Sequence, residues 1–330
     1  MDKNKIIKLD YLSSLDVSGE GASELLQGQI SCDINKGKEN IDYWSSLGVL
    51  CNVKGRVISS FLVSSGKLHL SDDSSKPYEY SLIGPRKTLL KTKEVLDKYL
   101  PFYKDVEIKE SRGSYYAIPR FLGTKEKPDY KTHSYLKEQT LPKYLFDEVK
   151  DYCNKFCVDG MFGLETHLEL HDYLGKDYLL GICGLGKPTE AFEKNNNNEF
   201  EDKLDNWYLD DILHRNVEIT VDMSEKYTPH ELLYDKTGRI DFDKGCYTGQ
   251  EVVARMQYRS KSLPRLYLAE CEGKDIKENM TICNEKNNKV GNLIKVVNFL
   301  DKSLCLISAK EKNLISSIKV KETNSNLNII

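Results

Sequence analysis

Beyond Pro264 the chain changes to short β-type runs that are separated by turns containing Gly, Asn and Lys. Runs of this length, punctuated by turn residues, are typical of strands in a small antiparallel domain. The sequence therefore predicts an all-β C-terminal domain. Its expected strands are Arg265–Cys271, Val290–Val297, Ser303–Ser308 and Ile315–Val320.

The rest of the chain is too long to share one core with that domain. A chain of 330 residues exceeds what a single hydrophobic core usually serves, so about two domains are expected, with three small ones as the alternative. No apolar run approaches the ~18 residues that a membrane span needs, and no signal-like apolar block follows the first residues. We expect a soluble, cytoplasmic protein with no membrane partner.

The net charge and the spacing of the cysteines bear on which partners, disulfides and metal sites are expected. The formal net charge is −3 with both signs interspersed, which disfavours tight generic binding to nucleic acid, so no direct nucleic-acid partner is expected. The nine cysteines form no CxxC pair, which favours free thiols over a disulfide framework or a structural zinc site. Cys153 and Cys157 lie on an apolar helix stripe and are interpreted as core thiols, so no metal site is predicted.

The N-terminal half alternates between strand and helix signals. Apolar spacing predicts a helix from Ala22 to Ile30 with Ser18 as a candidate N-cap, and a second helix that ends at Pro101. Pro142 opens a further helix. Strands are expected over Arg56–Ser64, Lys67–Leu70, Asp105–Glu110 and Ser114–Ile118, the first two forming a hairpin. The order β-β-α-β-β-α predicts a split α+β sheet with helices on one side.

The octapeptide from Lys244 to Glu251, Lys-Gly-Cys-Tyr-Thr-Gly-Gln-Glu, combines residues whose chemistry makes joint sense. Gly245 and Gly249 bracket Cys246 and permit positive φ or a close approach of the backbone to a ligand. The nearby ammonium group of Lys244 is expected to lower the thiol pKa and so to favour the reactive thiolate. Cys246 is therefore the candidate nucleophile, and Lys244 its candidate activator.

The residues that follow the octapeptide are spaced for a helix. Glu251, Arg255 and Arg259 recur every four positions, which on a helix gives one charged ridge that could hold a carboxylate tail. The alternative is a glycine-containing interdomain turn followed by a solvated helix with salt bridges.

The octapeptide and its continuation Val-Val-Ala-Arg resemble the signature of YgfZ proteins, a folate-binding branch of the glycine-cleavage T-protein superfamily that maintains iron–sulfur enzymes. Three more stretches agree with the family in order and spacing: Leu26–Asp33, Cys51–Arg56 and Thr228–Leu232. The resemblance spans most of the chain and is weaker between about residues 105 and 200.

The resemblance implies an α+β fold with three domains in a cloverleaf around a cavity for a reduced folate. It divides the chain into residues 1–50 plus about 160–243 as the folate-cavity domain, about 51–159 as a ferredoxin-like unit, and 244–330 as the signature loop with a C-terminal β-barrel. Trp207 is expected beside the pterin, where flat rings stack well. Tyr11 stands where the family has a second tryptophan and is expected to substitute for it.

The remaining folate contacts that the resemblance implies come from the motif stretches. The cofactor is tetrahydrofolate or a reduced one-carbon derivative, and Arg255 and Arg259 are candidates for its glutamate carboxylates. Further expected cavity residues are Gln29, Asp33, Tyr247, Gln250 and Glu251.

Three functions remain open at this stage. The family implies a folate-dependent accessory protein for iron–sulfur enzymes, including those that thiolate tRNA, with cluster assembly proteins as further partners. A one-carbon transferase is the second hypothesis, and it would need a carboxylate near the folate nitrogen, for which Asp33 and Asp235 are the nearest candidates. The third is a non-catalytic docking module that folate stabilises.

Overall fold

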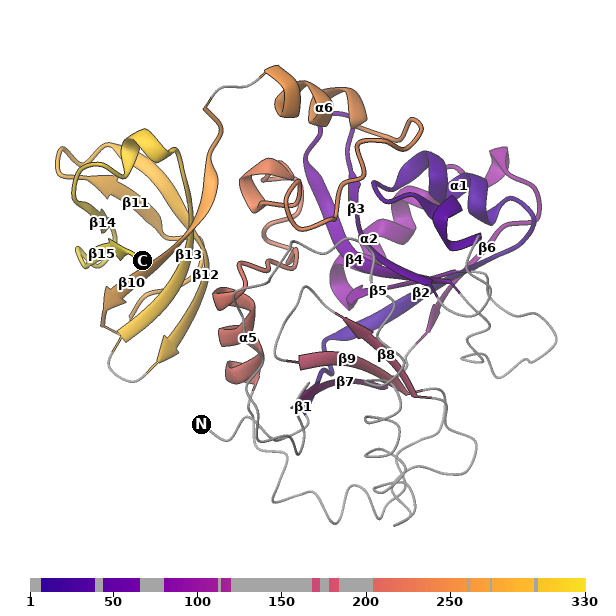
Figure 1. The fold of residues 1–330 in the computed structure, drawn as a ribbon, viewed down its shortest axis with the longest axis horizontal. Coiled ribbons are helices and arrows are strands. Elements are labelled where there is room, and N and C mark those ends of the chain that lie inside the picture. The colour runs from indigo at the N-terminus through magenta and orange to yellow at the C-terminus, as the bar shows by residue number, and fades with distance from the viewer. Residues whose placement is uncertain are drawn as a thin grey trace, which may run out of the picture.

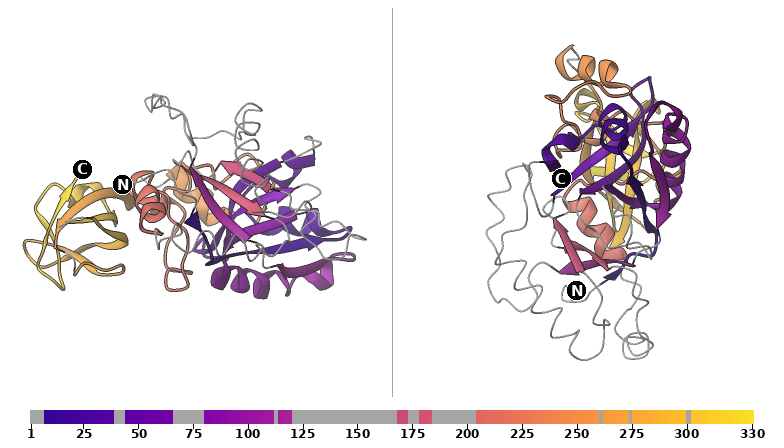
Figure 2. Two further views of the ribbon diagram at one scale, coloured as in Figure 1. Left: turned by 90° about the horizontal axis from the view of Figure 1, so that it is seen from below. Right: turned by 90° about the vertical axis from the view of Figure 1, so that its right-hand side faces the viewer.

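The protein is described by a computed structural model over residues 7–38, 44–65, 80–111, 114–119, 168–172, 178–183, 204–259, 262–273, 275–299 and 302–330. Two sheets and a closed barrel make up its strands. The barrel lies at one end of the molecule and the two sheets lie toward the other (Figures 1 and 2). Several predictions fall outside the described residues: the strand Lys67–Leu70, the helix opened by Pro142, and Cys153 and Cys157.

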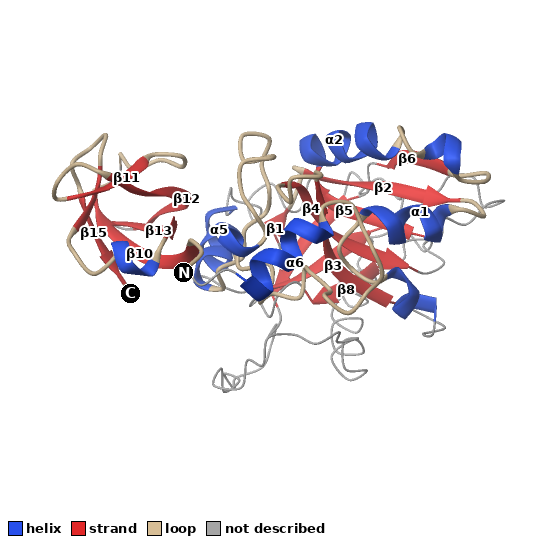
Figure 3. Ribbon diagram, turned by 90° about the horizontal axis from the view of Figure 1, so that it is seen from above, coloured by secondary structure: helices blue, strands red, loops and turns tan. Residues whose placement is uncertain are grey.

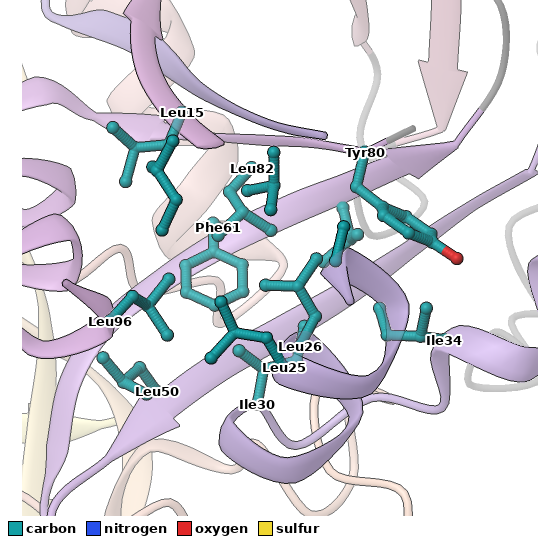
Figure 4. Close-up of a cluster of buried hydrophobic side chains, with 14 of the residues drawn as sticks. Leu15, Leu25, Leu26, Ile30, Ile34, Leu50, Phe61, Tyr80, Leu82 and Leu96 are labelled. Atoms are coloured by element: carbon teal, nitrogen blue, oxygen red, sulfur yellow. The ribbon is translucent and has the colours of Figure 1, made fainter. Parts of the chain in front are cut away.

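The larger sheet has five antiparallel strands in the order β3-β4-β5-β2-β6. One face is covered by two helices, α1 (Ala22–Gln29) and α2 (Arg86–Leu96). Leu25 and Leu26 of α1 and Leu96 of α2 meet Phe61 of the sheet in a buried apolar cluster (Figure 4). The strands are β2 (Leu12–Ser18), β3 (Trp44–Cys51), β4 (Val57–Ser65), β5 (Tyr80–Pro85) and β6 (Glu107–Ser111).

The smaller sheet has four antiparallel strands in the order β1-β7-β9-β8. The prediction that Asp105–Glu110 and Ser114–Ile118 share one sheet is wrong, because β6 pairs with β2 and β7 pairs with β1 and β9. Burial explains the division: Ile108 packs into the cluster under α1 and α2, whereas Tyr115 packs against Trp207. The strands are β1 (Ile7–Lys8), β7 (Ser114–Pro119), β8 (Leu168–Asp172) and β9 (Tyr178–Cys183).

The C-terminal barrel closes in the order β10-β13-β12-β11-β14-β15, and its antiparallel strands surround an apolar interior. The predicted all-β C-terminal domain is confirmed. The last predicted strand is shorter than expected, since β14 spans only Ile318–Val320 and Ile315 is 87% exposed. The other strands are β10 (Arg265–Glu272), β11 (Thr281–Asn284), β12 (Lys289–Phe299), β13 (Lys302–Ala309) and β15 (Asn326–Ile329).

The ends of the first two helices differ from those predicted from the sequence. Ser18 is not an N-cap: it ends β2, where it pairs with Glu107, and α1 follows Gly21 without a side-chain cap. Gly19 makes this turn with φ +110°, and a Cβ there would lie 1.7 Å from the Asp105 carbonyl oxygen. The helix predicted to reach Pro101 ends as α2 at Leu96, and the 3-10 turns η1 (Ile34–Lys38) and η2 (Leu100–Phe102) follow the two helices.

The segment 204–259 lies in the chain between β9 of the four-stranded sheet and β10 of the barrel. It begins with helix α5 (Leu204–Leu213), passes through the 3-10 turn η4 (His230–Leu232) and ends with helix α6 (Gln250–Arg259). Its apolar residues share a core with β3, β4 and the barrel, including Ile212, Tyr234, Val253, Val49 and Ile294. In Figure 1, α5 lies beside the barrel and α6 forms the top of the molecule.

The mixed α and β composition expected from the sequence is confirmed. In the barrel, one 3-10 turn, η5 (Glu311–Asn313), lies between β13 and β14. The five-stranded sheet takes strands from both sides of the predicted boundary at residue 51, whereas the division into domains itself stays a prediction. Within the described ranges, no helix is both long enough and apolar enough to cross a membrane.

Candidate functional site

The four motif stretches meet at the ends of α1, β3 and α6. Lys244 makes the tightest link: its ammonium group donates hydrogen bonds to the carbonyl oxygens of Gln27 at 2.8 Å, Ile30 at 2.7 Å and Cys32 at 3.0 Å. These carbonyls end helix α1, where cations are favoured by the helix dipole and by the unpaired acceptors. The signature is thereby fixed to the stretch Leu26–Asp33.

Further bonds join the same two stretches. The Thr248 backbone N–H donates to the Gly28 carbonyl at 3.2 Å, and the Thr248 hydroxyl donates to the buried side chain of Gln29 at 2.9 Å. Ser31 donates to the Arg239 carbonyl at 2.5 Å, and Lys36 pairs with Asp241 at 2.7 Å. The chain before the signature is therefore held along its length by residues 27–36.

Gly249 fits the signature against the turn that follows β3. It has φ +84°, and a Cβ there would lie 2.4 Å from the Asn52 carbonyl oxygen. Gly55 of that turn also has positive φ, at +69°, and its own Cβ position is 3.0 Å from Val252 of α6. Only glycine combines these φ values with such close backbone approach, so the predicted role of Gly249 is confirmed.

Gly245 differs from Gly249. It is not among the glycines with positive φ, and no heavy atom lies within 4 Å of its Cβ position. Of the two possibilities expected for these glycines, positive φ is not found at Gly245, and a close approach of its backbone to a ligand stays a prediction. Its backbone instead borders open space beside Cys246.

The stretch Thr228–Leu232 completes the cluster. Glu231 accepts hydrogen bonds from the Thr228 backbone N–H at 2.7 Å and from Arg56 at 3.2 Å, which ties it to the turn after β3. Buried His230 lies 3.0 Å from the side-chain oxygen of Gln257 in α6. We call these four joined stretches the motif cluster.

Cys246 is the accessible thiol of the motif cluster. Of the six cysteines whose side chains the structure describes, Cys246 is exposed and the others are buried. Burial raises the pKa of Cys32 and of Cys51 to about 12. Buried thiols with such pKa values stay protonated at neutral pH and are poor nucleophiles.

Lys244 does not have the geometry that the sequence suggested. All three donors of its ammonium group are used by backbone carbonyls, and its side chain is buried. Burial lowers the pKa of Lys244, and the negative charges of Asp33 and Asp241 oppose this shift. The ammonium group thus positions the loop and has no donor left for a thiolate at Cys246.

Of the other candidate site residues in the signature and in α6, some are buried and others are exposed. Tyr247 is buried beneath the Lys244 ammonium group, 5.2 Å from its ring centroid, and burial raises the pKa of its hydroxyl. Gln250 donates to the Lys244 carbonyl at 3.5 Å. Glu251, Arg255 and Arg259 are all exposed along α6, which confirms that their spacing is helical.

Trp207 and Tyr11 lie in a different place from the motif cluster. Trp207 on α5 is fully buried, and its ring is enclosed by Leu9, Leu12, Leu47, Leu62, Ile83 and Tyr115. Its indole N–H donates to the Tyr11 hydroxyl at 2.8 Å, which in turn donates to Glu218 at 2.8 Å. The indole has no solvent-exposed face in this structure, and it orients Tyr11 and, through Tyr11, Glu218. The placing of Trp207 beside a pterin stays a prediction.

Glu218 belongs to a buried polar network that the sequence did not single out. Tyr234 donates to the Val217 carbonyl at 2.5 Å, and the Arg239 guanidinium carbon lies 5.0 Å from the centroid of the Tyr234 ring. Arg239 also donates to Asn216 at 2.8 Å. The only signal for these residues is the placing of charged side chains between apolar ones, as in Val217-Glu218-Ile219, which is also common on solvated strands.

The buried network, with its carboxylate, phenols and guanidinium group, has the donors and acceptors that a flat polar heterocycle requires. A buried carboxylate can accept two parallel N–H donors, and an arginine can hold a carbonyl or carboxylate oxygen. Bringing these groups out of water costs free energy unless they are paired, so such a network is kept where it has a structural or binding role.

The two carboxylates considered for one-carbon transfer both make contacts within the protein, although the buried Oδ2 of Asp235 has no hydrogen-bond partner among the described residues. Asp33 accepts hydrogen bonds from Gln27 and from the Asn35 backbone N–H, each at 3.0 Å, which caps the turn after α1. Asp235 is buried and pairs with Arg265 of the barrel at 2.6 Å. Among the described residues, no group of three or more His, Cys, Asp or Glu side chains could hold a metal ion.

Comparison with known proteins gives relatives over most of the chain, although no family model matches it. The tRNA-modifying protein YgfZ of Vibrio vulnificus strain CMCP6 is 39% identical over 261 residues, covering 78% of this chain and 68% of that protein. The protein of the same name from Colwellia psychrerythraea is 27% identical over 267 residues, covering 79% and 70%. That of Vibrio atlanticus is 23% identical over 320 residues, covering 94% and 85%.

Among solved structures, aminomethyltransferase T of the glycine cleavage system from Bartonella henselae superposes with a TM-score of 0.65 at 11% sequence identity. The match covers 99% of this chain and 86% of that one. The likeness shows a shared fold, which includes the arrangement of sheets and barrel described above, and at this identity it shows the fold alone.

Proposed function

This chain belongs to the YgfZ family, and from that membership we propose that it is a folate-dependent accessory protein in tRNA modification. Its clients are iron–sulfur enzymes of the cytoplasm, including those that thiolate tRNA, and Cys246 is its reactive group. The relatives carry the name tRNA-modifying protein, which supports the process but not the chemistry.

The observation that carries the proposal is the convergence of four separate stretches of sequence on one exposed thiol. Lys244, Thr248 and Gly249 fix the loop on both sides of Cys246 through bonds to α1 and contacts with the turn after β3. A fold gains little from holding an exposed side chain so firmly, whereas a reacting group requires it.

The role of the folate rests on the buried network. When bound, a reduced folate supplies a one-carbon carrier at its ring nitrogens. Glu218 is the carboxylate suited to the N–H edge of a pterin, and Tyr11 and Trp207 hold Glu218 in place. Arg239, which lies over the Tyr234 ring, is the candidate cation for a polar oxygen. The donor set therefore fits the cofactor.

One-carbon transfer is the weaker alternative for the same fold. It needs a carboxylate that is available to an amine, and both Asp33 and Asp235 are already paired within the protein. The third alternative, a docking module without thiol chemistry, predicts slow alkylation of Cys246 with and without folate. Mass spectrometry of iodoacetamide labelling separates it from the proposal, which expects labelling to change when folate binds.

The proposal is tested by restoring thiolated tRNA nucleosides in cells that lack the gene. The Cys246→Ala chain is expected to restore less than a tenth of the thiolation that the native chain restores. Asp243→Ala changes an exposed neighbour in the same loop and is the matched control, which should restore it fully. Equal restoration by Cys246→Ala would show that the thiol is not required.

A further inference from the structure

Helix α6 presents an exposed face directly after the Cys246 loop. Its outward side chains include Glu251, Arg255, Tyr258 and Arg259, and the turn Asn52–Gly55 adds Val53 and Lys54. The turn packs on α6 through Gly55 and Val252, so the exposed side chains of the turn and of the helix lie on neighbouring elements. We call these six side chains the α6 surface. Helix α6 lies at the top of the molecule in Figure 1 and toward the viewer in Figure 3.

Two large apolar side chains of the α6 surface are left open. Tyr258 and Val53 are each 74% exposed. Tyr258 is nevertheless held in place, because its ring makes an edge contact with Phe242 at 6.3 Å and the neighbouring Gln257 is bonded to His230. A rigid, exposed tyrosine on a fixed helix is typical of the anchoring residues of protein interfaces, since little conformational entropy is lost when it binds.

The cations of the α6 surface are also unpaired. Within the part of the chain that the structure describes, Arg255, Arg259 and Lys54 take part in no ion pair, although the described surface pairs many of its other cations. Arg255 and Arg259 are four residues apart on one helix, where like charges repel each other. A partner that supplies carboxylates would relieve that repulsion and would pair both guanidinium groups.

The charge pattern favours an acidic protein over RNA. Glu251 lies on the same helix as Arg255 and Arg259, and Asp243 is exposed in the loop before α6. A phosphate backbone would be repelled by both carboxylates. An aliphatic side chain such as Val53 suits an apolar pocket in a protein rather than the face of a base. In Figure 1, α6 lies at the top of the molecule and α5 lies lower, beside the barrel.

We propose that the α6 surface is the docking site for the client protein of Cys246, and that the client meets it with an acidic surface containing an apolar pocket for Tyr258. The inference rests on the proposed function and names its partner by chemistry. The client's reacting atoms would then be brought beside the exposed thiol, because α6 begins four residues after Cys246.

The test measures binding of the full-length chain to a purified iron–sulfur enzyme that thiolates tRNA, by biolayer interferometry at low and high salt. Arg255→Glu combined with Arg259→Glu is expected to weaken binding at least tenfold, and Tyr258→Ala to weaken it at least fivefold. Salt should weaken the native complex and have little effect on the charge-reversed one.

The controls change equally exposed residues on other faces. Lys286→Glu combined with Lys289→Glu reverses two exposed charges on the barrel, and Phe102→Ala removes an exposed aromatic ring. Both should bind the client as the native chain does. Binding that falls equally in the controls, or not at all in the α6 variants, overturns the docking site.

Two other occupants of the α6 surface, RNA and the folate tail, would give different results. If the α6 variants lose tRNA binding or lose the rise in melting temperature with tetrahydrofolate, while client binding is unchanged, the surface serves RNA or the folate tail and the proposal is overturned. Failure of the proposed function is seen separately, as a native chain that does not restore thiolated tRNA in cells that lack the gene.

Discussion

Lys244 shows how one buried side chain can set the geometry of an exposed one. Its three hydrogen bonds end α1 and hold the signature loop, so the reactivity proposed for Cys246 depends on position rather than on a neighbouring charge. The sequence placed Lys244 close to Cys246 along the loop but did not predict the direction in which the ammonium group points, because spacing along a loop does not fix side-chain orientation.

Replacing Lys244 by methionine keeps the length of the side chain and removes its donors. We expect Lys244→Met to lower the free energy of unfolding by about 2–3 kcal/mol, since three buried carbonyls lose their partner. Urea denaturation measures the change. Lys54→Met, at an exposed position, is the control and should leave the unfolding midpoint unchanged; similar midpoints for the two variants would contradict the role of Lys244.

His230 gives the protein a predictable sensitivity to acid. Burial lowers the pKa of His230 below its usual 6.5, and the charge of Asp235 opposes this shift. The unfolded chain therefore takes up the proton at a higher pH than the folded one, so the stability contributed by neutral His230 is present above pH 6.5 and is lost progressively below it.

The melting temperature of the native chain should accordingly fall between pH 7 and about pH 5, and His230→Gln should reduce that fall. Glutamine keeps a polar group next to Gln257 but does not titrate. Differential scanning fluorimetry across this pH range compares the two chains. Curves that run parallel at every pH would show that another group controls the acid response.

At the scale of single elements, the turn that packs the signature against β3 depends on one glycine and not on the other. Gly249→Ala is expected to destabilise the protein by about 2 kcal/mol or more, because the new Cβ combines a positive φ with a clash against the Asn52 carbonyl. Gly245→Ala, whose Cβ would meet open space, should change stability by less than about 0.5 kcal/mol. Chemical denaturation of both variants tests this contrast, and equal losses would contradict it.

Elements that were not predicted from the sequence lack a pattern that distinguishes a buried side from an exposed side. All seven residues of β2 are buried, so no alternation of polar and apolar residues marks it as a strand. The helices α1, α2 and α6 were predicted because each has one buried and one exposed side. The separation of β6 and β7 into two sheets depends on distant partners, Leu15 and Leu180 among them, which local sequence does not contain.

The motif cluster was predictable for a different reason. Its members are tied by close backbone contacts that need particular residues, such as Gly249 against Asn52, and these appear as short recognisable stretches. The buried network around Glu218 depends on side chains from α5, the residues before β2 and the segment before α6. No local pattern marks such a set.

For the whole molecule, the barrel is joined to α5 by a buried ion pair. Lys295 of β12 pairs with Asp211 at 2.6 Å and lies 4.8 Å from the centroid of the Tyr208 ring. Asp211 is fully buried, so removal of its partner leaves an uncompensated charge. The docking of the barrel and the placing of Trp207 on α5 are therefore linked.

Lys295→Met should lower the free energy of unfolding by about 3 kcal/mol and should make the barrel melt separately from the rest. Differential scanning calorimetry detects the second transition. Lys302→Met, which removes an exposed ion pair within the barrel, is the control and should keep one transition. A single unshifted transition for Lys295→Met would show that the barrel is held mainly by apolar contacts.

The proposed function depends most on the binding of a reduced folate by the buried network, and thermal denaturation with increasing tetrahydrofolate tests this binding most directly. A ligand at about 100 times its Kd stabilises the folded state by about 2.7 kcal/mol, so the melting temperature of the native chain should rise with concentration. Glu218→Gln, which removes the carboxylate charge at nearly constant size, should abolish most of that rise. A native chain whose melting temperature does not respond to tetrahydrofolate would contradict the folate-dependent function.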